Sequence, residues 1–139
     1  MTGVVVDASV AIKWLLPQRD DERDGEKALT LLEAVKAEQV ELYQPAHWLA
    51  EVAAVVSRLS PSTALEDISD LCGMNVEIVS STQIYLDACQ LSVDLEHHLF
   101  DTLYHAVALH IDQGILVTAD ERYYKKALRH GRLILLRDF

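Results

Sequence analysis

Two aspartates directly follow short apolar segments. Asp7 comes after Val4-Val5-Val6, and Asp120 comes after the apolar segment 115–119. Short, wholly apolar segments of this kind are typical of buried strands, so both acids are expected just past the carboxyl ends of strands. In open α/β sheets, ligand sites form in the crevice at that edge. An alternative interpretation is that each aspartate only caps the helix that follows it.

Two further acids lie inside apolar segments with helical spacing. Glu51 is the only acid between residues 46 and 56, and Asp101 is the only acid between residues 99 and 109. An isolated carboxylate in apolar surroundings is costly unless it is paired or bound to a metal ion. The alternatives are that Glu51 lies on an exposed stripe of its helix, and that Asp101 is a helix N-terminal acid favoured by the dipole.

Four such acids in one small chain are explained more simply by one shared metal site than by a separate structural role for each acid. Converging carboxylates are the hard oxygen ligands that Mg²⁺ and Mn²⁺ require. An ion held in this way can draw in a phosphodiester oxygen, lower the pKa of a bound water and neutralise charge during an in-line displacement. The residues therefore indicate metal-dependent hydrolysis of a phosphodiester.

Strands and helices are expected to alternate along the chain. Apolar, β-branched runs predict strands, and residues 3, 4 and 7 apart on one face predict helices. Residues 18–25 are polar and charged and are predicted to form a loop. The predicted strands are wholly apolar and span residues 3–6, 40–43, 76–79, 115–118 and 133–136. The predicted helices span residues 10–16, 26–38, 46–59, 61–72, 81–95, 99–113 and 120–130.

This alternation predicts an α/β fold in which a mostly parallel sheet carries helices on both faces. The chain has 139 residues, of which 50% are hydrophobic and 24% are charged, so it can bury a core of its own. No internal repeat, low-complexity tract or linker interrupts it. We therefore expect a single domain over residues 1–139.

Composition also bounds the setting of the protein. The N-terminus has no basic segment followed by a long apolar run, and no stretch is long enough to span a bilayer. The cysteines, Cys72 and Cys89, have no zinc-ligand spacing and are predicted to be buried free thiols rather than a disulfide. A reduced, cytoplasmic location with no membrane contact is expected.

The charge is unevenly distributed. The formal net charge is −10, yet the segment from Arg122 to the C-terminus holds six basic residues and one acid. One interpretation of this segment is a track for an RNA backbone, with contacts from Arg122, Lys125, Lys126 and Arg129. The alternative is a solvated face with cations favourably placed near a helix end.

At the four acids the sequence resembles a PIN domain, and more narrowly the VapC toxins of bacterial and archaeal type II toxin–antitoxin pairs. The resemblance runs from about residue 3 to the end. The matching segments are Val4-Val5-Val6-Asp7-Ala8-Ser9, Pro45-Ala46-His47-Trp48-Leu49-Ala50-Glu51-Val52, Phe100-Asp101-Thr102-Leu103-Tyr104 with Ala106 and Ala108, and Leu116-Val117-Thr118-Ala119-Asp120.

This resemblance implies a three-layer sandwich around a five-stranded sheet, and an endoribonuclease that depends on Mg²⁺ or Mn²⁺. Asp7, Glu51, Asp101 and Asp120 match the acidic positions of the family one by one, as catalytic residues and metal ligands. Ser9 and Thr118 match positions where a hydroxyl supports the acids, although Ser9 could simply cap its helix and Thr118 could be strand filler. The resemblance also implies a homodimer and a small antitoxin protein that holds the enzyme inactive.

Different functions on these residues are also conceivable. The six histidines permit a softer metal site, but no HExxH motif is present, and His47 beside Glu51 could tune the carboxylates. A phospho-acceptor signalling domain would need an acidic neighbour for Asp7 and a lysine after the last strand. Asp7 has no acidic neighbour, and the predicted last strand is followed by Arg137, so this function is disfavoured. The same fold could also serve a PIN nuclease that acts in RNA processing without an antitoxin, or a non-catalytic binding module.

Overall fold

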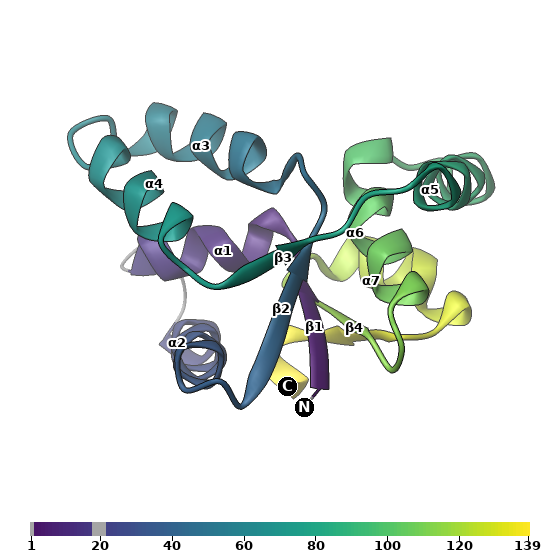
Figure 1. The fold of residues 1–139 in the computed structure, drawn as a ribbon, viewed down its shortest axis with the longest axis horizontal. Coiled ribbons are helices and arrows are strands. Elements are labelled where there is room, and N and C mark those ends of the chain that lie inside the picture. Colours follow the sequence, from purple (N-terminus) through teal and green to yellow (C-terminus); the bar gives the residue numbers. More distant parts are fainter. Residues whose placement is uncertain (1, 18–21) are drawn as a thin grey trace.

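Five short strands form one sheet at the centre of the molecule (Figure 1). The computed structural model describes residues 2–17 and 22–139. The strand order is β3-β2-β1-β4-β5, and all four neighbouring pairs are parallel. The strands are β1 (Thr2–Val6), β2 (Val40–Gln44), β3 (Val76–Ile78), β4 (Ile115–Thr118) and β5 (Leu133–Leu135). The predicted α/β class and the five strands are confirmed.

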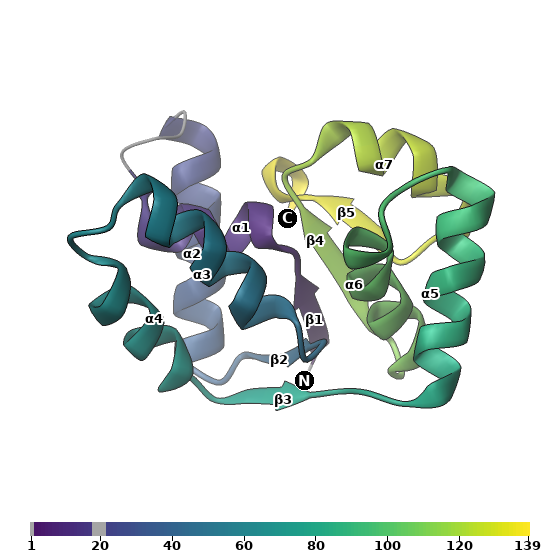
Figure 2. The same cartoon turned by 90° about the horizontal axis from the view of Figure 1, so that it is seen from above.

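Helices cover both sides of this sheet. Figure 2 shows the helices that precede β3 on one side of the sheet and those that follow β3 on the other. The helices are α1 (Ala8–Leu15), α2 (Glu22–Lys36), α3 (Trp48–Leu59), α4 (Ala64–Cys72), α5 (Thr82–Leu95), α6 (Leu99–His110) and α7 (Glu121–Ala127). Two short 3₁₀ helices, Leu128–His130 and Leu136–Asp138, flank the last strand. The expected three layers are therefore present.

The central strands are buried in the core. Val4, Val5 and Val6 of β1 and Val117 of β4 are 0% exposed. Strands that are covered on both faces need apolar side chains at every position, which explains why apolar and polar residues do not alternate in these segments. The prediction of wholly apolar strands is wrong toward the β3 edge, where Glu41 of β2 and Glu77 of β3 are exposed.

Several predicted boundaries differ from the structure. Helix α2 begins at Glu22, so the predicted loop over residues 18–25 is wrong for residues 22–25; residues 18–21 lie outside the described part of the chain. Helix α6 ends at His110 instead of residue 113. Gly114 then packs against the helix end so closely that an added Cβ would lie 2.6 Å from the Ala108 carbonyl oxygen. Close packing, rather than helix capping, requires glycine there.

Both cysteines contradict their predicted burial. Cys72 and Cys89 are free and exposed. Each follows a buried residue, Leu71 and Ala88 respectively, and so turns away from the core at the next helical position. In the described part of the chain, no helix has the length and apolar character needed to cross a membrane.

Candidate active site

The carboxyl edge of the sheet brings Asp7 and Thr118 together. Strands β1 and β4 are neighbours although more than 100 residues separate them, and their register pairs Val6 with Val117. The next residue of each strand is therefore also side by side, and the Thr118 hydroxyl donates a hydrogen bond to Asp7 Oδ2. The chain adds β2 and β3 on one side of β1 and β4 and β5 on the other. Such a switch point is where open α/β sheets form ligand sites.

Both carboxylate oxygens of Asp7 accept a hydroxyl hydrogen bond. Ser9 donates to Oδ1 and also accepts a hydrogen bond of 3.0 Å from the Ala119 backbone N–H. The side chain of Asp7 forms no capping hydrogen bond to α1, although the residue stands at the N-cap position. Asp7 is therefore not a side-chain cap. Ser9 lies inside α1 and bonds Asp7 instead of capping the helix, and the fully buried Thr118 is more than strand filler.

Asp120 has two structural roles at once. Its Oδ1 accepts a 3.0 Å hydrogen bond from the Tyr123 backbone N–H and caps α7, as the alternative interpretation expected. Its own backbone N–H donates to Thr118 Oγ1 at 3.0 Å, which links it to the Asp7 contact. A cap need not exclude a second role, because a carboxylate oxygen carries more than one lone pair.

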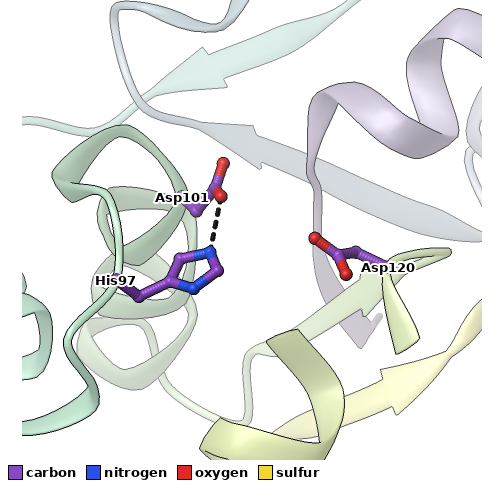
Figure 3. Close-up of side chains that lie close together, drawn as sticks. All are labelled: His97, Asp101 and Asp120. Atoms are coloured by element: carbon purple, nitrogen blue, oxygen red, sulfur yellow. Dashed lines mark hydrogen bonds and ion pairs between the residues drawn. The ribbon is translucent and has the colours of Figure 1, made fainter. Parts of the chain in front are cut away.

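Asp101 and Asp120 lie near each other beside a histidine (Figure 3). Asp101 is in the first turn of α6, and its Oδ2 is 2.7 Å from His97 Nε2. Ligand atoms of His97, Asp101 and Asp120 all lie within 4.8 Å of one another. In the described part of the chain, these three residues form a group that could hold a metal ion.

Glu51 comes from the first turn of α3, on the other side of the sheet. Its side chain is 26% exposed, so it does not lie on a fully solvated stripe. Tyr104 of α6 donates its hydroxyl to Glu51 Oε1 at 3.3 Å. His47 is 3.7 Å from Glu51 Oε2, but its Nε2 donates to the Phe100 carbonyl at 2.9 Å.

The pKa values show that the acids act on one another. Burial raises the pKa of Asp7 from 3.8 to about 6, and the charges of Asp101 and Asp120 add to this rise against the lowering by Ser9 and Thr118. Burial, with the charge of Asp101, raises the pKa of Glu51 from 4.5 to about 7. Both carboxyl groups therefore keep their protons to a higher pH than usual, because poor solvation and like charges surround them.

The same crowding makes this group chemically suited to a divalent cation. All four acids are partly buried, and the structure provides oxygen donors from β1, α3, α6 and the β4–α7 junction. Oxygen donors of this kind suit Mg²⁺ and Mn²⁺ better than soft metals. A cation would also offset the repulsion that raises the pKa values of Asp7 and Glu51. The residues present therefore fit a divalent metal ion.

The predicted basic residues separate into two pairs. Arg122 and Lys126 border a hollow of about 490 Å³ next to the acids, whereas Lys125 and Arg129 are exposed and do not line it. Lys126 Nζ lies 3.3 Å from His97 Nδ1 and 3.3 Å from the Glu96 carbonyl oxygen. The other residues that line this hollow are Ser92, Glu96, His97, His98 and Leu99.

Sequence reasoning gave no role to Gln44 or Tyr104, and it considered His97 only as a possible metal ligand near Asp101. Gln44 is fully buried at the end of β2 and bonds the backbone of Val6, immediately before Asp7. Tyr104 contacts Glu51, and His97 contacts Asp101. The only signal for Gln44 in the sequence was its position, as a polar residue at the end of a predicted strand. The spacing of His97, one helical turn before Asp101, was the signal for the histidine.

His105, one helical turn after Asp101, belongs to the core and not to the candidate site. It is fully buried, donates from Nε2 to the Gly131 carbonyl at 2.9 Å, and accepts at Nδ1 from the Tyr123 hydroxyl at 2.9 Å. Burial lowers the pKa of this imidazole. Gly131 has a φ of 75°, so a residue without a side chain suits the turn that presents this carbonyl.

Comparisons with known proteins agree with this fold. A family model described as "PIN domain" matches residues 4–128. The crystal structure of VapBC2 from Rickettsia felis bound to a DNA fragment from their promoter contains a chain that is similar in fold, with a TM-score of 0.68 and 18% sequence identity. The similarity covers 96% of this chain and 97% of that one. No curated protein matches the sequence.

Proposed function

The chain belongs to the PIN domain family, and we propose that it is a metal-dependent endoribonuclease and the toxin of a toxin–antitoxin pair. The observation that carries the nuclease proposal is that Asp101 and Asp120 lie close together and that Asp7 and Glu51 feel the charge of Asp101. The pKa of Asp7 is raised to about 6 and that of Glu51 to about 7, mainly by burial. Acids whose pKa values are raised by burial and by neighbouring charges are typical of functional sites. We also propose that residues 1–139 act as one domain.

The proposed ligands of the ion are Asp7, Glu51, Asp101 and Asp120, and the ion is Mg²⁺ or Mn²⁺. When bound, such an ion supplies a Lewis acid that neutralises a phosphodiester oxygen and lowers the pKa of water. Ser9 and Thr118 hold the Asp7 carboxylate in one orientation through its two oxygens. Tyr104 donates to one oxygen of Glu51 and stays a donor in this contact, since burial and nearby acids raise its pKa above the usual value.

RNA as the substrate is supported by features next to the acids. Arg122 and Lys126 offer positive charge to a phosphate backbone on one side of Asp101. Phe100, the residue before Asp101, is 60% exposed, and its ring stacks on His47 with 5.4 Å between centroids. An exposed aromatic ring at the rim of such a site offers a face on which an unpaired base can stack.

The partner proposals rest on exposed apolar side chains and on the related assembly. VapBC2 is named as a complex that binds its promoter DNA, and by analogy we propose a small antitoxin protein for this chain. Leu59 and Leu65 are exposed near the α3–α4 junction and give such a protein an apolar surface. Tyr85, Leu86 and Val93 are exposed on α5, and we propose this face for a homodimer.

The test is cleavage of a mixed tRNA, rRNA and mRNA pool by the purified protein, free of any partner. Parallel reactions contain Mg²⁺, Mn²⁺ or EDTA and compare the wild type with Asp7→Asn and Asp101→Asn. Asp112→Asn is the matched control, because Asp112 is an exposed acid just after α6. We expect cleavage with either ion, none with EDTA, and a loss of at least about a hundredfold in the two site variants only.

Three results would contradict different parts of the proposal. Cleavage that persists in EDTA or in both site variants would point to a contaminating nuclease or to other catalytic groups. A folded protein that binds Mn²⁺ but cuts no RNA in the pool would favour the non-catalytic binding module. A protein that cuts RNA and yet has no partner gene would retain the nuclease and favour the processing enzyme over the toxin.

A further inference from the structure

His97 connects the acidic cluster to the basic helix α7. It lies between α5 and α6, and only 8% of its side chain is exposed. Its ring packs edge-on against Tyr123, with 4.8 Å between the ring centroids. The imidazole is therefore fixed in position by packing, unlike the neighbouring His98, which is exposed.

The hydrogen bonds of this imidazole have a defined direction. Lys126 Nζ is 3.3 Å from Nδ1, and an ammonium group can only donate. Nδ1 is then the acceptor, which places the ring proton on Nε2. Nε2 lies 2.7 Å from Asp101 Oδ2 and donates to it. The chain of contacts thus runs from Lys126 through His97 to Asp101.

We propose that His97 is a positioning residue that orients the Asp101 carboxylate for the divalent ion, with Lys126 selecting the tautomer that can donate. This inference rests on the proposed metal site. As Figure 3 shows, the bond from His97 engages one oxygen of Asp101, and the other oxygen is outside this bond. Hydrogen bonds from outside the ligand shell hold ligating carboxylates in place and tune metal affinity.

Direct ligation by His97 is the competing interpretation, because its ring nitrogen lies within 4.8 Å of ligand atoms of Asp101 and Asp120. Two observations favour positioning. The Nε2 proton is already committed to Asp101, so this nitrogen has no lone pair for an ion in the structure. In addition, the surrounding donors are carboxylate oxygens, which select hard ions that prefer oxygen ligands.

The experiment measures the Mn²⁺ affinity of the purified protein at one pH, by titration calorimetry and by electron paramagnetic resonance. His97→Ala is expected to weaken Mn²⁺ binding about tenfold or more. His97→Gln keeps a side-chain N–H donor and is expected to recover most of this loss. Lys126→Met leaves the imidazole without its tautomer-selecting partner and should weaken binding by a smaller factor. His98→Ala is the matched control and should bind as the wild type does.

Circular dichroism and thermal unfolding establish that each variant is folded, and the Gln and Met variants carry the test if His97→Ala does not fold. Unchanged affinity in His97→Ala, or a His97→Gln variant as weak as the alanine variant, would overturn the proposal. So would a ¹⁴N coupling of Mn²⁺ to a directly bound imidazole that disappears in His97→Gln. A wild type that binds no Mn²⁺ would instead refute the metal site of the proposed function.

Discussion

The side-chain amide of Gln44 forms two hydrogen bonds with the backbone of Val6, one to its N–H and one to its carbonyl, each of 2.8 Å. The side-chain amide thus continues the hydrogen bonds between β1 and β2 in the way that a further backbone peptide of β2 would. These bonds reach Val6, the residue directly before Asp7. Both partners are fully buried. The position of the first acid is therefore fixed by a side chain on the neighbouring strand.

We expect Gln44→Leu to lower the free energy of unfolding by about 2–4 kcal/mol, because it leaves a buried N–H and a buried carbonyl of Val6 without partners. Urea unfolding in EDTA measures this loss without any contribution from metal binding. Gln39→Ala, at an exposed position, is the control and should change the value by less than about 0.5 kcal/mol. Equal stability of Gln44→Leu and the wild type would show that these two bonds contribute little.

Thr118→Val is expected to weaken Mn²⁺ binding, measured by titration calorimetry, about tenfold. The free energy of unfolding is measured as well, to compare the stability of the variant with that of the wild type. Valine has the shape of threonine but cannot donate to Asp7 or accept from the Asp120 backbone. The pKa of Asp7 should rise further, since the Thr118 hydrogen bond now lowers it. Thr118→Ser keeps the hydroxyl and should bind Mn²⁺ nearly as well as the wild type. Equal affinities for the Val and Ser variants would argue against the hydroxyl.

The metal-free protein should lose stability as the pH rises from about 4 to about 7. The unfolded carboxyls of Asp7 and Glu51 lose their protons near pH 3.8 and 4.5, whereas the folded ones keep theirs until about pH 6 and 7. Over this window the folded state binds more protons than the unfolded state, so raising the pH favours unfolding. The contribution of Asp7 to this change is on the order of 3 kcal/mol.

Urea unfolding at several pH values in EDTA measures this dependence. Asp7→Asn should show a smaller loss of stability between pH 4 and 7 than the wild type, and Asp112→Asn should follow the wild type. Added Mn²⁺ should reverse the trend, because the ion binds the ionised carboxylates and its affinity rises with pH. Parallel curves for Asp7→Asn and the wild type would mean that Asp7 titrates normally.

Arg122→Glu is expected to weaken RNA binding more than Lys125→Glu does. Arg122 borders the hollow beside the acids, whereas Lys125 does not. Fluorescence anisotropy with a labelled single-stranded RNA, at several salt concentrations and with Ca²⁺ in place of Mg²⁺, measures both the affinity and its salt dependence. In the Arg122 variant, the plot of log binding constant against log salt concentration should become less steep, by the amount expected for the loss of about one phosphate contact. Equal effects of both substitutions would favour a general charge effect.

Leu86→Glu and Val93→Glu should convert the proposed homodimer to a monomer without unfolding it. Both side chains are exposed on α5, at 57% and 72%. A charge there costs little in the monomer, but it would lose its hydration when buried in an apolar interface. Light scattering after size exclusion gives the mass, and Asp94→Lys, on the polar face of α5, is the control. A wild type that is monomeric at all concentrations would refute the dimer.

The fold was predictable because its signals are local. Short β-branched runs such as Val4-Val5-Val6 alternate with amphipathic segments, and this alternation leaves few arrangements other than a covered parallel sheet. Helix ends were less predictable. At residues 22–25, charged residues suggested a loop, yet they form the first turn of α2, because helix propensity and the packing of α2 against α1 outweigh polarity there.

The sequence by itself determined that four acids stand at strand ends or in apolar helical segments, because burial and period are encoded in neighbouring residues. Only the tertiary structure decided what surrounds each acid. Strand register joined Thr118 to Asp7 across 111 positions, and helix packing joined Tyr104 to Glu51 and Lys126 to His97. Contacts between distant segments depend on how whole elements pack, which residues adjacent in sequence do not specify.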